Sequence, residues 1–390
     1  DPLWSRGLGD VYKRQDPNVV LIANPGSDLY GSDRMVLETV RALVGAGRRV
    51  VVTVPMAGPL VPLLEEAGAE VVECATPIVR KGLLNARGLV ELVVTTIKAV
   101  GPGLRLLRRV DPGAVIVNTI TPPLWILLGR ISRRRTVCHV HEGEGSVAGI
   151  VRRALYLPLV FSDRVIANSD FTRRVLASSA PRVRDRTIVV HNAVPGPGEV
   201  VPPRIALTAP TRLLYVGRLS HRKGVHVAVD ALDALVREDR DVRLDVVGAV
   251  FPGNEAYLDE LRAQVARCGL EDRVSFLGFK SSVWDDLARS DIAVITSLVD
   301  ETFGNTAVEA ALAARPAVVS KVGGLPEAVS SSQSATLVAP GDAAALAAAI
   351  AAKIDDWPSQ ATLAVSDSSA VADAFSVDRY TDGILAALPR

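Results

Sequence analysis

Two basic residues in the second half of the chain have the types and spacing to bind a charged ligand. Arg218 follows an apolar, strand-like run, and Lys223 stands five residues later, directly before a helical pattern begins. Two cations beside the N-terminus of a helix suit a phosphate or a diphosphate. The alternative is an ordinary exposed basic loop at the end of a strand.

Two acidic residues frame a second segment of interest, which reads ETFGNTAVE from Glu301 to Glu309. It follows another strand-like run and leads into a helix, and Gly304 in its middle lets backbone N–H groups approach a ligand closely. The two carboxylates can accept hydrogen bonds from the vicinal hydroxyls of a sugar or a ribose. Ordinary acidic residues at the start of an amphipathic helix are the alternative. The Phe-Gly pair in a strand-loop-helix context favours a binding loop.

The first half of the chain carries two further candidate segments. The loop from Asn24 to Asp33 contains Gly26 and Gly31 but no GxGxxG, so a dinucleotide site is disfavoured. His139 and His141 close a strand and share one of its faces, so one of them is enough to serve a cleft. No third His or Cys accompanies them at ligand spacing, and we therefore predict no metal site.

Strands and helices alternate along the whole chain, which predicts an α/β fold of two doubly wound, Rossmann-like domains with parallel sheets. The Pro- and Gly-rich stretch from Val194 to Gly198 separates the two series and is the best linker. Ligands of such sheets bind beyond the carboxyl ends of the strands, so two facing sheets predict an interdomain cleft. The expected strands are 19–23, 49–54, 70–72, 114–117, 136–140 and 164–167, then 212–216, 244–247, 273–277, 292–295 and 317–320.

We predict four segments. Residues 1–16 have neither helical nor strand period and look like a non-native leader. Residues 17–193 form the first domain, and residues 194–375 form the second. Residues 376–390 have helical period, and we expect them to cross back onto the first domain.

Composition and charge exclude several classes of protein. The 390 residues are 48% hydrophobic and 22% charged, which is typical of a folded interior, and a net charge of +1 argues against a nucleic-acid binder. Three distant cysteines form no disulfide framework, so we expect a cytoplasmic protein. The charge is unevenly distributed: residues 18–193 carry 23 Lys and Arg against 14 Asp and Glu, whereas residues 194–390 carry 18 against 26.

Taken together, these motifs resemble glycosyltransferase family 4, whose members are retaining enzymes of GT-B fold. The resemblance covers nearly the whole chain, from about Asn18 to Leu388. The segments that carry it are LYGSDR (29–34), HVHE (139–142), VHNAV (190–194), GRL (217–219) with KG (223–224), FLG (276–278), the 301–309 block and GGLPE (323–327).

The resemblance implies a role for each candidate residue. Arg218 and Lys223, next to Gly217, would grip the diphosphate of a nucleotide-sugar donor, and Gly31 would let the first domain approach it. Glu301 and the backbone around Gly304 would hold the donor sugar, and Glu309 the ribose. The cleft histidine of the family maps to His141 or, with less support, to His139. The expected catalytic residues are thus His141, Glu301, Arg218 and Lys223, and the expected donor-binding residues are Gly31, Gly217, Arg218, Lys223, Glu301, Phe303, Gly304, Asn305, Thr306 and Glu309.

The function that we expect from this resemblance is hexosyl transfer from a nucleoside-diphosphate sugar to a hydroxyl of a glycan, a lipid-linked glycan or a small molecule. Cations and a helix N-terminus can stabilise the leaving diphosphate, so neither a metal nor another cofactor is expected. A nucleotide-sugar-binding or sensing module without transferase activity, or a GT-B-type nucleotide-sugar epimerase, is the alternative. The base, the sugar and the acceptor stay open at this point.

The first domain of this family usually binds the acceptor, and here it is the basic half. Its cations lie on or beside helices with apolar faces, as expected of a protein at the inner face of an anionic membrane. An arginine-rich solvated surface is the alternative. The cations concerned are Arg80, Lys81, Arg87, Lys98, Arg105, Arg108, Arg109, Arg130 and Arg133–Arg135.

Overall fold

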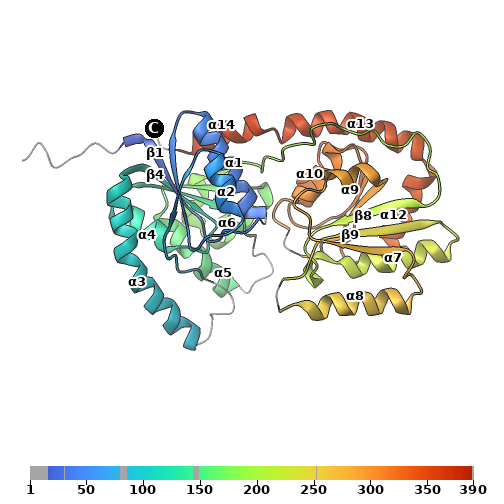
Figure 1. Cartoon of the computed structure of the whole chain (residues 1–390), viewed down its shortest axis with the longest axis horizontal. Helices are drawn as coiled ribbons and strands as arrows, with labels where there is room; N and C mark the ends of the chain where they lie inside the picture. The colour runs from blue at the N-terminus through green and yellow to red at the C-terminus, as the bar shows by residue number, and fades with distance from the viewer. Residues whose placement is uncertain are drawn as a thin grey trace, which may run out of the picture.

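The computed structural model describes residues 16–388, apart from residues 30, 80–85, 144–148, 252 and 300. Two α/β domains lie side by side, each built on one parallel sheet (Figure 1). The predicted fold class is confirmed. Residues 1–15 of the expected leader lie outside the described residues, and residue 16 is already the first residue of a strand.

The first domain has a seven-stranded parallel sheet in the order β3-β2-β1-β4-β5-β6-β7. Its central strands are short β-branched runs that are buried on both faces, as parallel sheets require. The strands are β1 (Asp16–Ala23), β2 (Arg49–Val54), β3 (Glu70–Glu73), β4 (Pro112–Asn118), β5 (Arg135–Val140), β6 (Arg164–Ala167) and β7 (Thr187–Val189).

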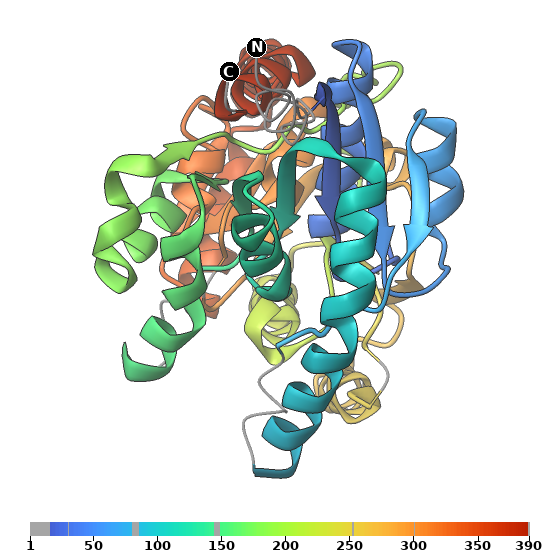
Figure 2. The ribbon, with the colours of Figure 1, turned by 90° about the vertical axis from the view of Figure 1, so that its left-hand side faces the viewer.

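Helices cover both faces of this sheet (Figure 2). One face carries α1 (Gly31–Gly45), α2 (Leu60–Glu66) and α14 (Val377–Ala387). The opposite face carries α3 (Ala86–Val110), α4 (Leu124–Ile131), α5 (Gly149–Tyr156), α6 (Asp170–Ser179) and the 3₁₀ turns η2 (Leu157–Phe161) and η3 (Pro181–Arg186).

The second domain has a six-stranded parallel sheet in the order β10-β9-β8-β11-β12-β13. Its strands are β8 (Thr211–Val216), β9 (Val242–Val247), β10 (Val274–Gly278), β11 (Ile292–Ile295), β12 (Ala317–Ser320) and β13 (Ala335–Val338). One face packs on α7 (Val225–Arg237), α8 (Glu255–Arg267) and α12 (Ala343–Asp355), and the other on α9 (Trp284–Arg289), α10 (Asn305–Leu312), α11 (Leu325–Ala328) and α13 (Trp357–Ala374).

The end of the chain returns to the first domain. Helix α13 runs from the second domain along one side of the molecule, and α14 continues onto α1 (Figure 1). Tyr380 and Ile384 of α14 are buried there, and the Tyr380 hydroxyl lies 2.6 Å from Thr39 Oγ1. Two chain crossings therefore join the domains.

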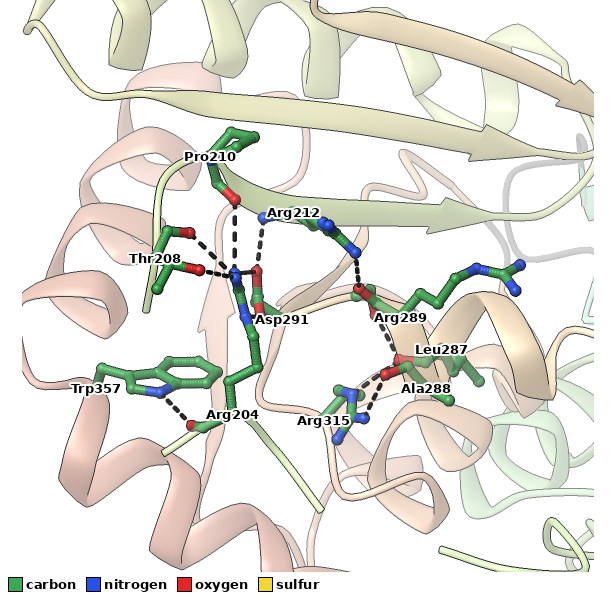
Figure 3. Close-up of polar contacts among 11 residues, drawn as sticks. Arg204, Thr208, Pro210, Arg212, Leu287, Ala288, Arg289, Asp291, Arg315 and Trp357 are labelled. Atoms are coloured by element: carbon green, nitrogen blue, oxygen red, sulfur yellow. Dashed lines mark hydrogen bonds and ion pairs between the residues drawn. The ribbon is translucent and has the colours of Figure 1, made fainter. Parts of the chain in front are cut away.

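The first of these crossings, between β7 and β8, is pinned to the second domain near its end (Figure 3). Arg204 forms a bidentate pair with the buried Asp291. The same carboxylate accepts the backbone N–H of Arg212 at 2.7 Å, and the Trp357 indole donates to the Arg204 carbonyl at 2.8 Å. These contacts hold Arg204 and Arg212, near the end of this crossing, on the second domain.

Among the described residues, no helix has the length and apolar character needed to cross a membrane.

Candidate active site

A cleft of about 620 Å³ lies where the carboxyl ends of the two sheets face each other, and both domains line it. All the expected catalytic and donor-binding residues line this cleft. They are Gly31, His141, Gly217, Arg218, Lys223, Glu301, Phe303, Gly304, Asn305, Thr306 and Glu309. His139 does not line it, so of the two histidines it is His141 that faces the cleft.

Lys223 and Glu301 form a close ion pair inside the cleft, through the Lys223 ammonium and Glu301 Oε2. Ser297 Oγ donates to the same carboxylate oxygen at 2.9 Å. Burial raises the pKa of Glu301, but the charge and hydrogen bond of Lys223 and the hydrogen bond of Ser297 outweigh it and hold this pKa below its usual value. Glu301 is therefore an ionised acceptor at neutral pH.

Tight backbone packing places Lys223 at this point. Gly224 directly follows it with a φ of +66°, and a Cβ there would lie 2.1 Å from the carbonyl oxygen of Thr296. Thr296 in turn donates its hydroxyl to the Lys223 carbonyl at 3.0 Å. The turn η4 (His221–Lys223) is thus held against the end of β11, beside the Glu301 loop.

Arg218 follows the end of β8, and its guanidinium lies over the ring of Phe251, with Cζ 3.7 Å from the ring centroid. This stacking orients a long side chain that solvent would otherwise leave mobile. The backbone before Arg218 packs closely on Gly248, which directly follows the neighbouring strand β9. Only a glycine fits there, because a Cβ would lie 1.8 Å from the Gly217 carbonyl oxygen.

The loop from Glu301 to Asn305 is supported from behind by the glycines of the GGLPE segment. A Cβ at Gly323 would lie 2.0 Å from the Glu301 carbonyl oxygen, and the Gly324 N–H donates to that oxygen at 2.7 Å. The Phe303 ring is buried between His191 and Phe375. Because this ring points into the protein, the loop offers a ligand mainly its backbone and the Glu301 carboxylate.

Glu309 lies one turn inside α10 and is buried. Burial raises its pKa, and the nearby charge of Arg34 partly opposes this effect. Arg34 belongs to α1 of the first domain: its Nη1 lies 3.6 Å from Glu309 Oε1, and its Nη2 donates to the Ser281 carbonyl at 2.8 Å. A side chain of the first domain thus crosses the cleft to the carboxylate that we expect to bind ribose.

His141 stands opposite these groups, and burial lowers its pKa to about 3, so its ring is neutral at physiological pH. Its Nε2 lies 3.0 Å from Asn118 Oδ1. The Asn118 amide nitrogen donates to Asn24 Oδ1 at 2.8 Å and to the Ser32 carbonyl at 3.3 Å. Since the Asn118 oxygen must then be the acceptor, His141 carries its proton on Nε2 and presents Nδ1 as an acceptor.

Glu142, next to His141, also lines the cleft. Burial raises its pKa to about 7, although hydrogen bonds from the N–H groups of Ile120 and His141 oppose that shift. The carboxyl ties the ends of β4 and β5 together and is half protonated near neutral pH. It is a second titratable group beside the histidine.

Two polar residues that shape the cleft carry no sequence signal strong enough for us to have named them. Asn168 lines the cleft, and Asn118 holds His141, which lines it. A polar residue that ends an otherwise apolar strand is the signal that would have found both. Arg34 and Asn192 also line the cleft; they stand in the LYGSDR and VHNAV segments, but no role was expected of them. Within the described ranges, no group of three or more His, Cys, Asp or Glu gathers so that it could hold a metal ion.

Comparison with known proteins identifies the family to which the chain belongs. Residues 188–365 match the family described as Glycosyl transferases group 1, and residues 29–195 match Glycosyltransferase Family 4. A lipopolysaccharide core biosynthesis mannosyltransferase, LpcC of Rhizobium leguminosarum, is 32% identical over 252 residues, which cover 57% of this chain and 69% of that protein. A glycogen synthase of Mycobacterium tuberculosis is 40% identical over 151 residues, 38% of this chain and only 35% of the relative's own length.

Solved structures share the whole architecture. HepE of Anabaena, determined in complex with UDP and glucose, superposes with a TM-score of 0.78 at 24% identity and covers 94% of this chain and 98% of its own. A glycosyltransferase from Rickettsia africae superposes with a TM-score of 0.77 at 18% identity, covering 95% and 97%. The fold is GT-B, and the chain belongs to the family 4 glycosyltransferases.

Proposed function

We propose that the protein is a retaining glycosyltransferase that moves a hexose from a nucleoside-diphosphate sugar to a hydroxyl acceptor without a metal ion. One observation carries the proposal. Arg218, Lys223 and Glu301 of the second domain face the neutral His141 of the first domain across a single cleft. Cations for a diphosphate, an acceptor for sugar hydroxyls and a neutral polar ring for the reacting sugar thus meet in one place.

In the proposed reaction the bond between the anomeric carbon and the β-phosphate oxygen breaks, and its electron pair stays on the phosphate. The acceptor hydroxyl attacks the anomeric carbon from the same face, and its proton passes to the departing phosphate oxygen. Arg218 and Lys223 stabilise the charge on this leaving group. The Lys223 ammonium has three donors, so it can keep Glu301 and still donate to a phosphate oxygen.

The remaining donor contacts follow from the same geometry. Glu301 and the backbone N–H groups that start α10 hold the sugar, and His141 Nδ1 accepts a hydrogen bond from one of its hydroxyls. Glu309 accepts the ribose hydroxyls. A Cβ at Gly31 would meet nothing within 4 Å, so the first-domain loop leaves room for the diphosphate.

A thermal-shift panel with UDP, GDP, ADP and dTDP tests the donor site. One of the four should stabilise the protein, by about 2.7 kcal/mol at 100 times its dissociation constant. UDP comes first because the HepE structure contains it. Folded protein that responds to none of the four would contradict the diphosphate site.

The matching nucleotide sugars then test the reaction, each with and without EDTA. Slow release of nucleoside diphosphate, unchanged by EDTA, is expected without an acceptor. An epimerase would instead convert the nucleotide sugar, and a sensing module would bind it and leave it intact.

We further propose that the first domain rests on an anionic membrane at the cytoplasmic side and receives a lipid-linked acceptor there. Helix α3 supports this with four exposed apolar side chains at helical spacing, Val90, Val93, Val94 and Ile97. Ile131 of α4 and Leu157 and Phe161 of η2 are exposed as well; α4 packs on α3, and η2 packs on α4. Exposed cations on α3 and α4 or shortly after α4 are Lys98, Arg105, Arg108, Arg109, Arg130, Arg133 and Arg135. Arg80 and Lys81 lie outside the described residues.

Co-sedimentation with vesicles tests the membrane proposal. The protein should sediment with phosphatidylglycerol vesicles and stay in the supernatant with phosphatidylcholine. The double variant Val93→Glu, Ile97→Glu should lose this binding. Val365→Glu, at a comparably exposed valine of α13, is the matched control and should bind like the wild type. Equal loss in both variants would contradict a role of α3.

A further inference from the structure

The loop that holds Glu301 is built by both domains. Thr302, the next residue, is contacted by two side chains of the first domain. Asn168 donates its amide to Thr302 Oγ1 at 3.2 Å, and the Ser169 hydroxyl donates to the Thr302 carbonyl. Gly143 packs on the same residue so closely that a Cβ there would lie 2.9 Å from the Thr302 methyl group.

The far end of the loop is held in the same way. Asn192, at the start of the interdomain linker, donates its amide to Asn305 Oδ1 at 2.8 Å. Asn305 is the first residue of α10, the helix that carries Glu309. Asn192 is buried, lines the cleft, and keeps its amide oxygen unpartnered among the described residues.

The support behind the loop is tied to the first domain as well. Gly323 and Gly324 pack against Glu301, and Glu327 of the same segment accepts the Asp170 N–H at 2.8 and 2.9 Å. Asp170 begins α6 of the first domain, so Glu327 sits at a helix N-terminus, where a carboxylate is favoured. Glu327 Oε1 also lies 2.5 Å from His191 Nε2.

The diphosphate residues are built differently. Lys223 is fixed by Gly224, Thr296 and Glu301, and Arg218 lies on Phe251; all of these belong to the second domain. Opening of the cleft would leave Arg218 on Phe251, and Lys223 on its backbone contacts through Gly224 and Thr296, because none of these contacts involves the 301–305 loop. It would remove from the loop the hydrogen bonds of Asn168, Ser169 and Asn192.

We propose that Asn168 and Asn192, with Ser169, are positioning residues that complete the donor-sugar site only when the domains are closed. The inference rests on the proposed function, since it assigns the 301–305 loop to the sugar. Nucleotide binding and catalysis then have different requirements. The second domain is enough to bind the nucleotide, whereas transfer of the sugar needs both domains.

Two variants test this, Asn168→Ala and Asn192→Ala. Ser169 is left unchanged because it also caps α6. Asn18→Ala, at an exposed asparagine of the first domain remote from the loop, is the matched control. Thermal shift with UDP, GDP, ADP and dTDP measures nucleotide binding by Arg218 and Lys223. Turnover of the matching nucleotide sugar measures the contribution of the 301–305 loop.

Both variants should lose about tenfold or more in kcat, because small displacements of reacting groups have large effects on rate. Their nucleotide dissociation constant should stay within about twofold of the wild type. The control should match the wild type in both. A kcat within about twofold of the wild type in both variants would overturn the proposal, and so would an equal loss of nucleotide binding.

Thr302→Val supplies a second, independent check, because it removes the same Thr302–Asn168 hydrogen bond from the other side. In a double-mutant cycle with Asn168→Ala, the combined loss in kcat should be smaller than the product of the two single losses. If the loss in kcat of the double variant equalled the product of the two single losses, Thr302 and Asn168 would act independently of each other.

Hydrogen–deuterium exchange of the 301–309 segment keeps the test apart from the proposed function. Even if no nucleotide binds, exchange should be faster in both variants than in the wild type and in Asn18→Ala. Unchanged exchange would overturn the positioning role, whereas faster exchange in a protein that binds none of the four nucleotides would refute only the donor assignment.

Discussion

Arg34 of the first domain reaches across the cleft to Glu309 of the second, with 3.6 Å between Nη1 and Oε1. The same guanidinium donates to the Ser281 carbonyl. The cleft is therefore bridged by a side chain at the carboxylate that we propose for ribose. A nucleoside that takes Glu309 has to share it with Arg34 or displace it.

Loss of this bridge should open the ligand-free protein. In Arg34→Ala the ion pair and the Ser281 hydrogen bond both disappear, so we expect a larger radius of gyration in small-angle X-ray scattering. Arg41→Ala, at an exposed arginine of the same helix that pairs with Glu38 three residues before it, should scatter like the wild type. An unchanged radius in Arg34→Ala would mean that the other interdomain contacts suffice to hold the cleft.

The Lys223–Glu301 pair should be essential for transfer. Lys223→Ala removes a cation from the leaving diphosphate, and Glu301→Ala removes a contact to the sugar, so each should reduce kcat by about 10²–10³-fold. Circular dichroism should show that both variants remain folded.

Lys321→Ala, at an exposed lysine of the second domain, is the control for that experiment and should keep its activity. Full activity in both site variants would contradict our assignment of the diphosphate and sugar contacts.

The pKa of His141 should depend on the residue at position 118. In Asn118→Asp the carboxylate lies beside the ring, so it favours the imidazolium and should raise the His141 pKa from about 3 toward its ordinary value. A lowered folded-state pKa destabilises the wild type as the pH falls from about 6.5 toward 3. The variant should lose part of that dependence.

NMR titration of the imidazole resonances measures this shift. Wild-type protein titrated in parallel gives the reference curve. An unshifted His141 in the variant would show that its neutral state is set by burial alone.

The sequence predicted the cleft more completely than it predicted the polar groups that shape it. Arg218, Lys223, Glu301 and Glu309 stand in recognisable motifs at strand ends, and sheet topology alone brings strand ends together. Asn118 and Asn168 stand in no motif, and their partners Asn24 and Thr302 are distant in sequence. The first pairing depends on how neighbouring strands of one sheet align, and the second on how the two domains dock; local patterns encode neither.

Several elements of the fold were not predicted, because their sequence patterns are weak. Helices α12 and α13 were not predicted, because the stretch 343–374 is rich in Ala and Ser and its apolar stripe is weak. Strand β13 was missed as well, since its four residues are half exposed at the sheet edge. By contrast, α14 was expected as a helix from its regular apolar spacing, and its Tyr380 and Ile384 are buried.

The pair between Arg204 and Asp291 should make a large contribution to the stability of the second domain. Asp291 is almost fully buried and accepts hydrogen bonds from Arg204 and from the Arg212 backbone (Figure 3). Asp291→Ala leaves both donors without their acceptor, which should lower the free energy of unfolding by about 3 kcal/mol. Urea denaturation followed by tryptophan fluorescence measures this change, since Trp357 packs beside Arg204.

The pair between Arg240 and Asp355 provides the control, because it is similarly bidentate but exposed. Asp355→Ala should leave the urea midpoint almost unchanged, since solvent screens exposed ion pairs. If the two substitutions shifted the midpoint equally, burial of Asp291 would not be the cause.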